Sequence, residues 1–389
     1  MTKKIPQLAD MFKQLIATSS VSCTQPHWDQ SNLDVIHLLE RWLKDLGFKT
    51  QVLPLPNDPK KANLVATLGS GPGGLVLAGH SDTVPYDQKL WHSDPFSLTE
   101  TNDKWYGLGT SDMKGFFPIA MEAAKAFLDK KLKHPLIILA TADEETSMAG
   151  ARALTQQNAF SIAGVNQPRY AVIGEPTNMK PIRMHKGIMM ERVQIKGQSG
   201  HSSDPTLGSN ALDAMHNVLG KLIAYRQQLQ QKHQSPYFDV DVPTLNLGCI
   251  HGGDNPNRIC GHCELQFDLR ALPGMNNAEL RDEIAQLLTP VEQEFQVKLE
   301  VDSIFDGIPA FSTEEESDIV KTTEKLTSNK SESVAFATEA PFLQSMGIET
   351  LVLGPGDIAQ AHQPNEYLDL NRIKPMVNVL QQLINRFCL

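Results

Sequence analysis

Four short apolar runs in this chain are each followed by a histidine or an acidic side chain, and these runs constrain the fold most. They occupy residues 75–77, 136–139, 171–173 and 350–353. Continuous runs of Val, Ile and Leu bounded by Gly or Pro indicate strands that are buried on both faces of a sheet. Residues 32–46 and 116–130 have helical patterns. Strands and helices that alternate in this way predict a three-layer α/β domain.

The pattern of apolar and polar residues changes near residue 187. Apolar and polar residues alternate in three segments, at residues 188–197, 245–250 and 259–269. This alternation indicates strands with one buried face. Residues 210–228 have a helical pattern, and a buried-strand pattern returns at residues 333–336. We therefore expect an α/β domain made of two chain segments with a small α+β domain inserted between them, with bounds at residues 1–186, 187–300 and 301–389.

The composition excludes several classes of protein. A chain of 389 residues is too long for one ordinary core. The net charge of -10, without a basic stripe, argues against a nucleic-acid partner. No segment approaches the roughly 18 apolar residues that span a bilayer, and the N-terminal segment does not resemble a signal peptide. Five scattered cysteines suit a reducing compartment, so we expect a cytoplasmic protein without a membrane partner.

Two motifs suggest other chemistry but lie in the wrong context. Cys260 and Cys263 form a CxxC pair within a predicted strand. Residues three apart in a strand point to opposite faces with Cα atoms about 10 Å apart, whereas a disulfide needs less than about 7 Å. Residues 69–74 spell GxGxxG, but they lead into a strand, and dinucleotide binding requires a helix there. We therefore expect neither a redox site nor a nucleotide site.

The side chains that follow the strands are expected to meet at one edge of the sheet, because ligands bind outside the carboxyl ends of strands in open α/β sheets. The set comprises His80, Asp82, Asp112, Asp143, Glu144, Glu145, Glu175 and His362. Such a cluster repels itself unless a cation fills it. Nitrogen and oxygen donors without thiolate suit zinc, cobalt or manganese. A shared aspartate would let two ions lie about 3.5–4 Å apart and acidify a water between them.

Several motifs resemble the dinuclear-zinc aminoacylase/carboxypeptidase family, in order and across nearly the whole chain. They are Gly-His-Ser-Asp at 79–82, Tyr-Gly-Leu-Gly-Thr-Ser-Asp at 106–112, Asp-Glu-Glu at 143–145, Gly-Glu-Pro-Thr at 174–177, Gly-His-Ser-Ser at 200–203 and the late His362. The resemblance implies a zinc-exopeptidase-like catalytic domain with an inserted ferredoxin-like domain, which would serve as a lid and for dimerisation. It also implies hydrolysis of an amide bond in an acyl-amino-acid substrate.

The resemblance implies a role for each residue of the cluster. His80 and Glu175 would bind one Zn²⁺ or Co²⁺ ion, Glu145 and His362 would bind a second, and Asp112 would bridge them. Asp82 would orient the imidazole of His80, as a partner of a ligand histidine commonly does. Glu144 would act as general base on the bridging water and then as general acid toward the amine.

The resemblance also implies functional residues outside the cluster. His201 would reach the active site of a partner subunit and stabilise the oxyanion, which would require a homodimer. Asn257, Arg270 and Thr338 would bind the substrate carboxylate, with arginine able to grip it bidentately.

Two alternatives remain open at this stage. Another family member, such as a succinyl-diaminopimelate desuccinylase or a carboxypeptidase, would share most of these motifs. A desuccinylase needs extra basic groups for its anionic acyl tail, whereas this chain places an acid at Glu339, which is hypothesised to meet a substrate ammonium group. A non-catalytic amino-acid-binding protein on the same scaffold would need a broken metal or base position, and none is broken.

Overall fold

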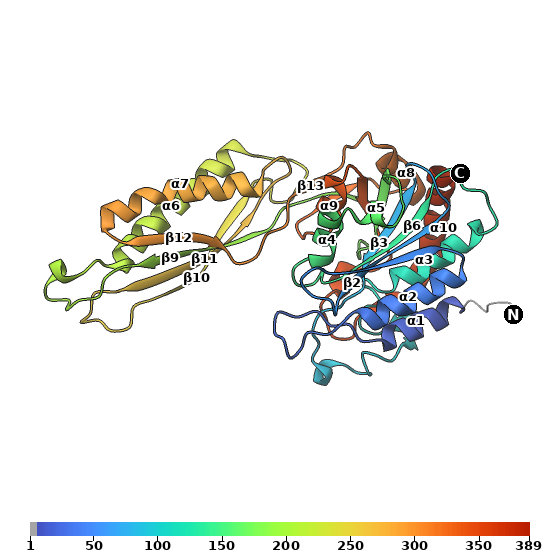
Figure 1. Cartoon of the computed structure of the whole chain (residues 1–389), viewed down its shortest axis with the longest axis horizontal. Coiled ribbons are helices and arrows are strands. Elements are labelled where there is room, and N and C mark those ends of the chain that lie inside the picture. Colours follow the sequence, from blue (N-terminus) through green and yellow to red (C-terminus); the bar gives the residue numbers. More distant parts are fainter. Residues whose placement is uncertain (1–5) are drawn as a thin grey trace. The chain divides into compact units, whose positions relative to one another are not determined.

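The computed structural model describes residues 6–389, which form two compact units (Figure 1). The first unit comprises the chain up to Arg183 together with Thr313–Glu332 and Thr338–Leu389. The second unit comprises Met184–Ser312 and Ser333–Ala337. Among the described residues, no helix combines the length and the apolar character needed to cross a membrane.

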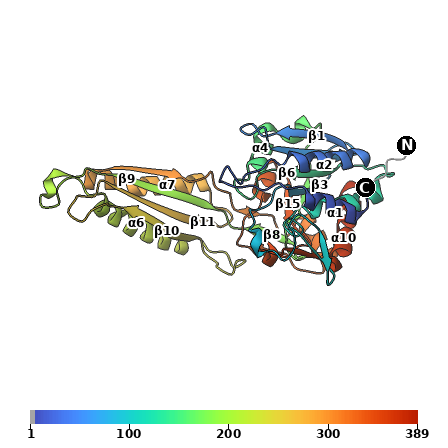
Figure 2. The same ribbon diagram turned by 90° about the horizontal axis from the view of Figure 1, so that it is seen from below.

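A mixed sheet forms the middle layer of the first unit. Its strands follow one another in the order β1 (Lys49–Pro54), β2 (Ala62–Leu68), β6 (Leu136–Thr141), β3 (Leu75–His80), β7 (Tyr170–Ile173), β15 (Glu349–Val352) and β8 (Ile182–His185). Figure 2 labels β1, β6, β3, β15 and β8 of this series. The four central strands, β6, β3, β7 and β15, run parallel. Every residue of β3, β6 and β7 is buried, as the continuous apolar runs predict.

Helices cover both faces of this sheet, so the predicted three-layer α/β fold is confirmed (Figure 1). One face packs against α3 (Phe116–Ala124) and α10 (Leu370–Cys388), and α1 (Leu8–Ala17) packs on α3. The remaining helices of the unit are α2 (Leu33–Asp45), α4 (Ala149–Gln157), α5 (Ala159–Ile162), α8 (Asp318–Thr327) and α9 (Ala340–Ser345). Helix α2 contacts β1 and β2, whereas α4 and α9 pack together.

Short elements complete the first unit. A three-stranded sheet has the order β16 (Tyr367–Asp369), β5 (Lys104–Tyr106) and β4 (Thr99–Thr101). Three 3-10 turns lie at η1 (Gln88–Leu90), η2 (Lys125–Phe127) and η4 (Ile358–Gln360). The sequence predicts one helix over residues 116–130, but α3 ends at Ala124 and η2 follows it.

The second unit is a four-stranded antiparallel sheet covered on one face by two helices (Figure 1). Its chain order is β9 (Met189–Lys196), η3 (Pro205–Leu207), α6 (Ala211–Lys232), β10 (Thr244–Gly252), β11 (His262–Arg270), α7 (Asn277–Phe295) and β12 (Lys298–Ser303). The strands lie in the order β10-β11-β9-β12. This βαββαβ arrangement is the ferredoxin-like fold that the sequence resemblance implies.

The residue pattern explains why the sheet of the second unit has one buried face and one exposed face. In β11, Cys263, Leu265, Phe267 and Leu269 are buried, whereas the residues between them are partly exposed.

Both helices begin at asparagines whose side chains accept hydrogen bonds from the first turn, Asn210 for α6 and Asn276 for α7. All five cysteines are free thiols. Cys260 lies before the start of β11, and both Cys260 and Cys263 are part of the buried core of this unit, so they do not lie on opposite faces of one strand as the sequence predicts.

Two further sequence expectations differ from the structure. The inserted domain is expected at residues 187–300, but the second unit begins at Met184 and extends to Ser312. The extension arises because β13 (Phe311–Ser312) pairs with the end of β8. The buried strand expected at residues 333–336 is wrong: β14 (Glu332–Val334) is short, and its residues are exposed or partly exposed.

Candidate metal centre

The carboxyl ends of the parallel strands gather the predicted cluster at one edge of the central sheet. His80 is the last residue of β3, and Glu175 lies two residues beyond β7. Glu144 and Glu145 follow the end of β6, and the loop after β15 leads to His362. Parallel strands end at the same edge, so residues far apart in sequence become neighbours here.

Two groups of possible metal ligands share Asp112. In the first, Nε2 of His80 lies 3.2 Å from Oδ1 of Asp112 and 3.9 Å from Oε2 of Glu175. In the second, Nε2 of His362 lies 3.0 Å from Oε2 of Glu145 and 3.5 Å from Oδ2 of Asp112. The two oxygens of one carboxylate thus face two different histidines, which is the arrangement that a bridging ligand requires.

The chemistry of these donors fits a pair of cations. Oε1 of Glu145 and Oε1 of Glu175 are buried without a hydrogen-bond partner. Burial raises the pKa of Glu175 well above its usual value, and the nearby carboxylate of Asp112 raises it further. Burial alone would lower the pKa of His80, but Asp112 and Glu175 raise it well above its usual value. Unpartnered carboxylate oxygens beside imidazoles are what divalent metal ions coordinate.

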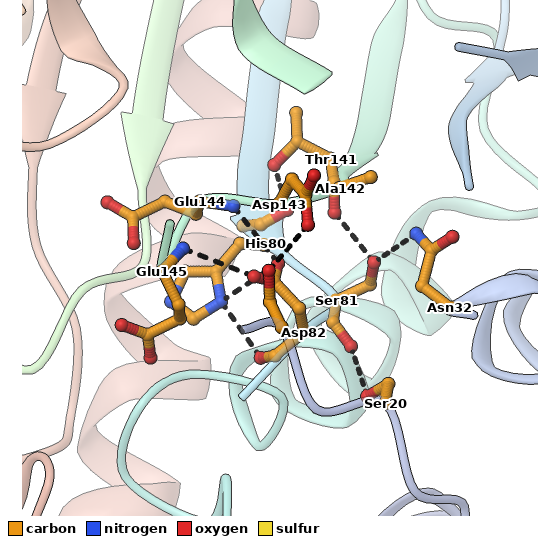
Figure 3. A network of polar contacts seen from close by, with 12 residues as sticks. Ser20, Asn32, His80, Ser81, Asp82, Thr141, Ala142, Asp143, Glu144 and Glu145 are labelled. Carbon is orange, nitrogen blue, oxygen red and sulfur yellow. Dashed lines mark hydrogen bonds and ion pairs between the residues drawn. The ribbon is translucent and has the colours of Figure 1, made fainter. Parts of the chain in front are cut away.

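Asp82 connects His80 to the turn that follows β6 (Figure 3). Its carboxylate accepts hydrogen bonds from the main-chain N–H of Glu144 at 3.3 Å and of Glu145 at 3.1 Å. Nδ1 of His80 lies 3.0 Å from the main-chain oxygen of Asp82 and 3.7 Å from its carboxylate. The sequence predicts that the carboxylate orients the imidazole; in this structure the main-chain oxygen is the closer partner.

Glu144 and Glu145 leave the same turn in different directions (Figure 3). The carboxylate of Glu145 contacts His362, and Glu144 and Glu145 together also form a third group of possible metal ligands with His80. Burial raises the pKa of Glu144 well above its usual value, and the charge of Glu175 adds to the increase. Glu144 is therefore a carboxyl group with a perturbed pKa beside the ligand cluster, which is typical of a catalytic acid or base.

Glu366 holds the loop that carries Asp112, and the sequence reasoning missed it. Its carboxylate accepts hydrogen bonds from the main-chain N–H of Gly109 at 2.9 Å, of Ser111 at 2.7 Å and of Asp112 at 2.9 Å. Burial raises its pKa to about 8, and the nearby Asp112 adds to this increase. Glu366 follows no strand of the central sheet, so the strand-end pattern contained no signal for it.

Thr338 and Glu339 lie at the start of α9 and are both buried. The hydroxyl of Thr338 accepts a hydrogen bond from the N–H of Ala340, and Oε2 of Glu339 accepts one from Thr141 at 2.7 Å. Burial raises the pKa of Glu339 to about 7. Glu339 is 2% exposed and its Oε1 is buried without a hydrogen-bond partner, so the hypothesis that it meets a substrate ammonium group stays a prediction.

The other predicted site residues belong to the second unit. His201 and Asn257 are exposed in loops, and Nδ1 of His201 lies 2.7 Å from the hydroxyl of Ser203. Arg270 is the last residue of β11 and pairs with Asp268 at 2.9 Å. Arg270 also lines a cavity of about 700 Å³ within this unit, together with Lys186 and Thr244. The structure therefore leaves Arg270 near open space, although its guanidinium already has one carboxylate partner.

Comparison with known proteins identifies the family to which this chain belongs. A model of peptidase family M20/M25/M40 matches residues 76–386. An acetylornithine deacetylase from Photorhabdus laumondii is 48% identical over 389 residues, which is 100% of this chain and 99% of that protein. 

Solved structures share the fold at low sequence identity. The aminopeptidase PepT from Bacillus cereus has a TM-score of 0.74 at 17% identity and covers 99% of both chains. The YxeP protein of Bacillus subtilis, described as a dinuclear metal-binding peptidase from the M20 family, has a TM-score of 0.66 at 13% identity and covers 97% of both. With a family match over most of its length and a close full-length relative, the chain belongs to peptidase family M20/M25/M40.

Proposed function

We propose that this protein hydrolyses the N-acetyl amide of N2-acetyl-L-ornithine to L-ornithine and acetate, a step of arginine biosynthesis in the cytoplasm. The observation that carries the proposal is the pair of ligand groups sharing Asp112, with Glu144 beside them. The substrate is suggested by the relative that is 48% identical along its whole length and is named acetylornithine deacetylase.

Particular segments of the sequence also favour this substrate. The chain resembles bacterial acetylornithine deacetylases at Asp-Glu-Glu-Thr-Ser-Met-Ala-Gly (143–150), Thr-Leu-Asn-Leu-Gly (244–248), Thr-Glu-Ala-Pro-Phe (338–342) and Leu-Gly-Pro-Gly (353–356). These segments come from both units, so the likeness is not limited to the metal ligands.

The proposed cofactor is two Zn²⁺ or Co²⁺ ions per subunit. His80 and Glu175 would hold one ion, Glu145 and His362 would hold the other, and Asp112 would bridge them. When bound, such ions acidify a water and polarise an acyl carbonyl.

Glu144 is the proposed general base. Its carboxylate would accept a proton from the attacking water and then deliver it to the departing amine nitrogen. A neighbouring pair of acids can divide these tasks because Glu144 and Glu145 leave the turn in different directions (Figure 3). Asp82 would support both, since it accepts hydrogen bonds from both of their main-chain N–H groups.

The substrate carboxylate would be bound by Asn257, Arg270 and Thr338, following the family resemblance. The oxyanion would receive a hydrogen bond from His201 of the partner subunit, which makes a homodimer part of the proposal. The exposed position of His201 on a loop of the second unit is compatible with such a reach.

A side-by-side hydrolysis assay tests the proposed substrate. The zinc- or cobalt-loaded protein is given N-acetylornithine, N-succinyl-diaminopimelate or N-acetylmethionine, and kcat/KM is measured for each. We expect the highest value with N-acetylornithine. Preference for the succinyl compound would replace the proposal with a desuccinylase, and hydrolysis of none of the three would contradict it.

A further inference from the structure

A buried lysine lies beside the turn that carries Glu144 and Glu145. Lys61 immediately precedes β2, and its side chain is 5% exposed. Its Nζ donates a hydrogen bond to Oδ1 of Asp29 at 2.7 Å and contacts Oδ1 of Asp143. A buried ammonium group is costly unless carboxylates compensate it, so these three residues form a linked unit. We refer to Lys61, Asp29 and Asp143 as the lysine clamp.

The lysine clamp holds the backbone of the turn through Asp143. Its φ of 61° lies in the left-handed region, which residues other than Gly seldom adopt. Its carboxylate accepts a further hydrogen bond from the hydroxyl of Ser22 at 2.5 Å. Its main-chain oxygen accepts from the N–H of Ser147 at 3.1 Å and of Met148 at 2.7 Å. The unusual backbone conformation is thus held through the side chain and through the residues that follow.

The residues after Asp143 are fixed by a second carboxylate. The N–H groups of Glu144 and Glu145 donate to Asp82, which also contacts His80 (Figure 3). The turn is therefore attached at two points, one through Asp143 and one through Asp82. Glu144 and Glu145 lie next to Asp143 in the chain, so a change in its conformation would redirect both side chains.

The charge of Lys61 is important to this arrangement. In the part of the chain that the structure describes, Lys61 is the cation that forms ion pairs with Asp29 and with Asp143. Without it, two partly buried carboxylates would face each other across the site of the missing ammonium group. Their repulsion would favour a movement of Asp143 toward solvent and away from its left-handed conformation.

We propose that Lys61 is a positioning residue for the hydrolytic reaction: through Asp143 it holds the turn in the conformation that aims Glu144 at the reacting water and Glu145 at the metal site. This role rests on the proposed hydrolase function and adds to it a residue that contacts neither the substrate nor the metal ligands' donor atoms. The attachment of the turn itself is a property of the metal-free protein, so it can be tested separately from activity.

The first test compares Lys61→Met, Lys61→Arg and, as the matched control, Lys60→Met on the exposed neighbouring lysine. Hydrogen–deuterium exchange of the metal-free protein is followed for peptides covering residues 141–149. We expect faster exchange of the Glu144 and Glu145 amides in Lys61→Met, and exchange like that of the wild type in Lys61→Arg and in the control. Equal exchange in all four proteins would overturn the proposal.

The second test measures kcat and KM of the zinc-loaded proteins with the best substrate from the assay above. A small misplacement of a catalytic group can cost about 100-fold in rate, so kcat of Lys61→Met should fall by about that factor while KM changes by less than about threefold. Lys61→Arg should restore most of the loss because it keeps the charge. If Arg and Met reduce activity equally, the charge of Lys61 does not act as proposed.

A further variant covers the case in which Lys61→Met does not fold. Asp143→Asn leaves Lys61 paired with Asp29 but weakens the attachment of the turn, and it should show the same faster exchange and lower kcat. Asp143→Asn with wild-type exchange and wild-type kcat would overturn the clamp. If the wild-type protein hydrolyses no acyl-amino acid, the proposed function fails, while the exchange data still decide whether Lys61 holds the turn.

Discussion

The carboxylate of Asp82 accepts a hydrogen bond from the main-chain N–H of Glu145 at 3.1 Å, although the two residues are 63 positions apart. Asp82 follows β3 and Glu145 follows β6, and these two strands are adjacent and parallel. The bond therefore couples the position of His80 to the position of the turn after β6. A ligand cluster built from separate strand ends needs such cross-connections to keep its donors in register.

Replacement of Asp82 should weaken metal binding without removing a ligand. Asp82→Ala deletes the acceptor for the Glu144 and Glu145 amides, so we expect a loss of about 10- to 100-fold in metal affinity, the range typical for partners of ligand residues. Titration of the metal-free protein with zinc measures it. Asp34→Ala, at an exposed position of α2, serves as control and should bind zinc like the wild type. Unchanged affinity in Asp82→Ala would show that the hydrogen bonds are dispensable.

Glu144 and Glu145 should give different losses when each is replaced by Ala. Glu144→Ala is expected to retain both metal ions but to lose about 10²- to 10⁴-fold in kcat, which is the usual contribution of a general base. Glu145→Ala is expected to lose metal, because its carboxylate faces His362. Metal content by mass spectrometry and kcat are measured on the same preparations. A Glu144→Ala protein with full metal content and normal kcat would disprove the assigned base.

Removal of metal should destabilise the protein. The ligand carboxylates of Asp112, Glu145 and Glu175 repel one another at close range when no cation compensates them. A ligand present at 100 times its dissociation constant stabilises the folded state by about 2.7 kcal/mol, so zinc should raise Tm and a chelator should lower it. Scanning fluorimetry with both additives measures the shift.

The substitution Glu175→Gln tests the same repulsion among carboxylates, because it should change Tm in opposite directions with and without zinc. It removes one negative charge from the cluster, so it should raise Tm of the metal-free protein. In the presence of zinc it should lower Tm relative to the wild type, because a ligand has been weakened. A change of the same sign in both conditions would indicate that Glu175 acts on stability by another route.

Most of the fold was predictable from local sequence patterns. The errors in the prediction have local causes. The runs at β3, β6, β7 and β15 indicate buried strands because each is continuous and apolar, and all four are strands of the central sheet. The segment at residues 333–336, Ser-Val-Ala-Phe, is also mostly apolar, but Val334 and Phe336 are only partly buried. Apolar composition alone does not determine whether a second layer covers a segment.

The site was predictable where its residues follow strands, and not where they act through the backbone. The proposed metal ligands follow strands or Gly-rich turns, which the sequence displays. Glu366 binds three main-chain N–H groups of a loop more than 250 residues earlier, as its contact with Asp112 shows. Hydrogen bonds to main-chain groups place no demand on the residue types of the donors, so this partnership leaves no trace in the sequence.

Thiol reactivity should separate the five cysteines into two sets. Burial raises the pKa of Cys388 to about 12, and burial also raises that of Cys263. A thiol with a raised pKa remains protonated at pH 8, and the thiolate is the reactive form. At pH 8 the partly exposed Cys23 and Cys249 should react rapidly with Ellman's reagent, whereas the three buried cysteines react only after unfolding. Fewer than five thiols in the unfolded protein would reveal a disulfide.

Glu366 should matter for stability as well as for the placement of Asp112. Glu366→Ala leaves three main-chain N–H groups without their acceptor, and burying unsatisfied donors costs about 1–3 kcal/mol each. Partial relaxation and water entry reduce the sum, so we expect a loss of about 3–5 kcal/mol in the free energy of unfolding, measured by urea denaturation. Glu332→Ala removes an exposed pair with Lys180 and should change stability by less than about 1 kcal/mol. If both variants unfold at the same urea concentration, the three hydrogen bonds to Glu366 do not stabilise the Asp112 loop.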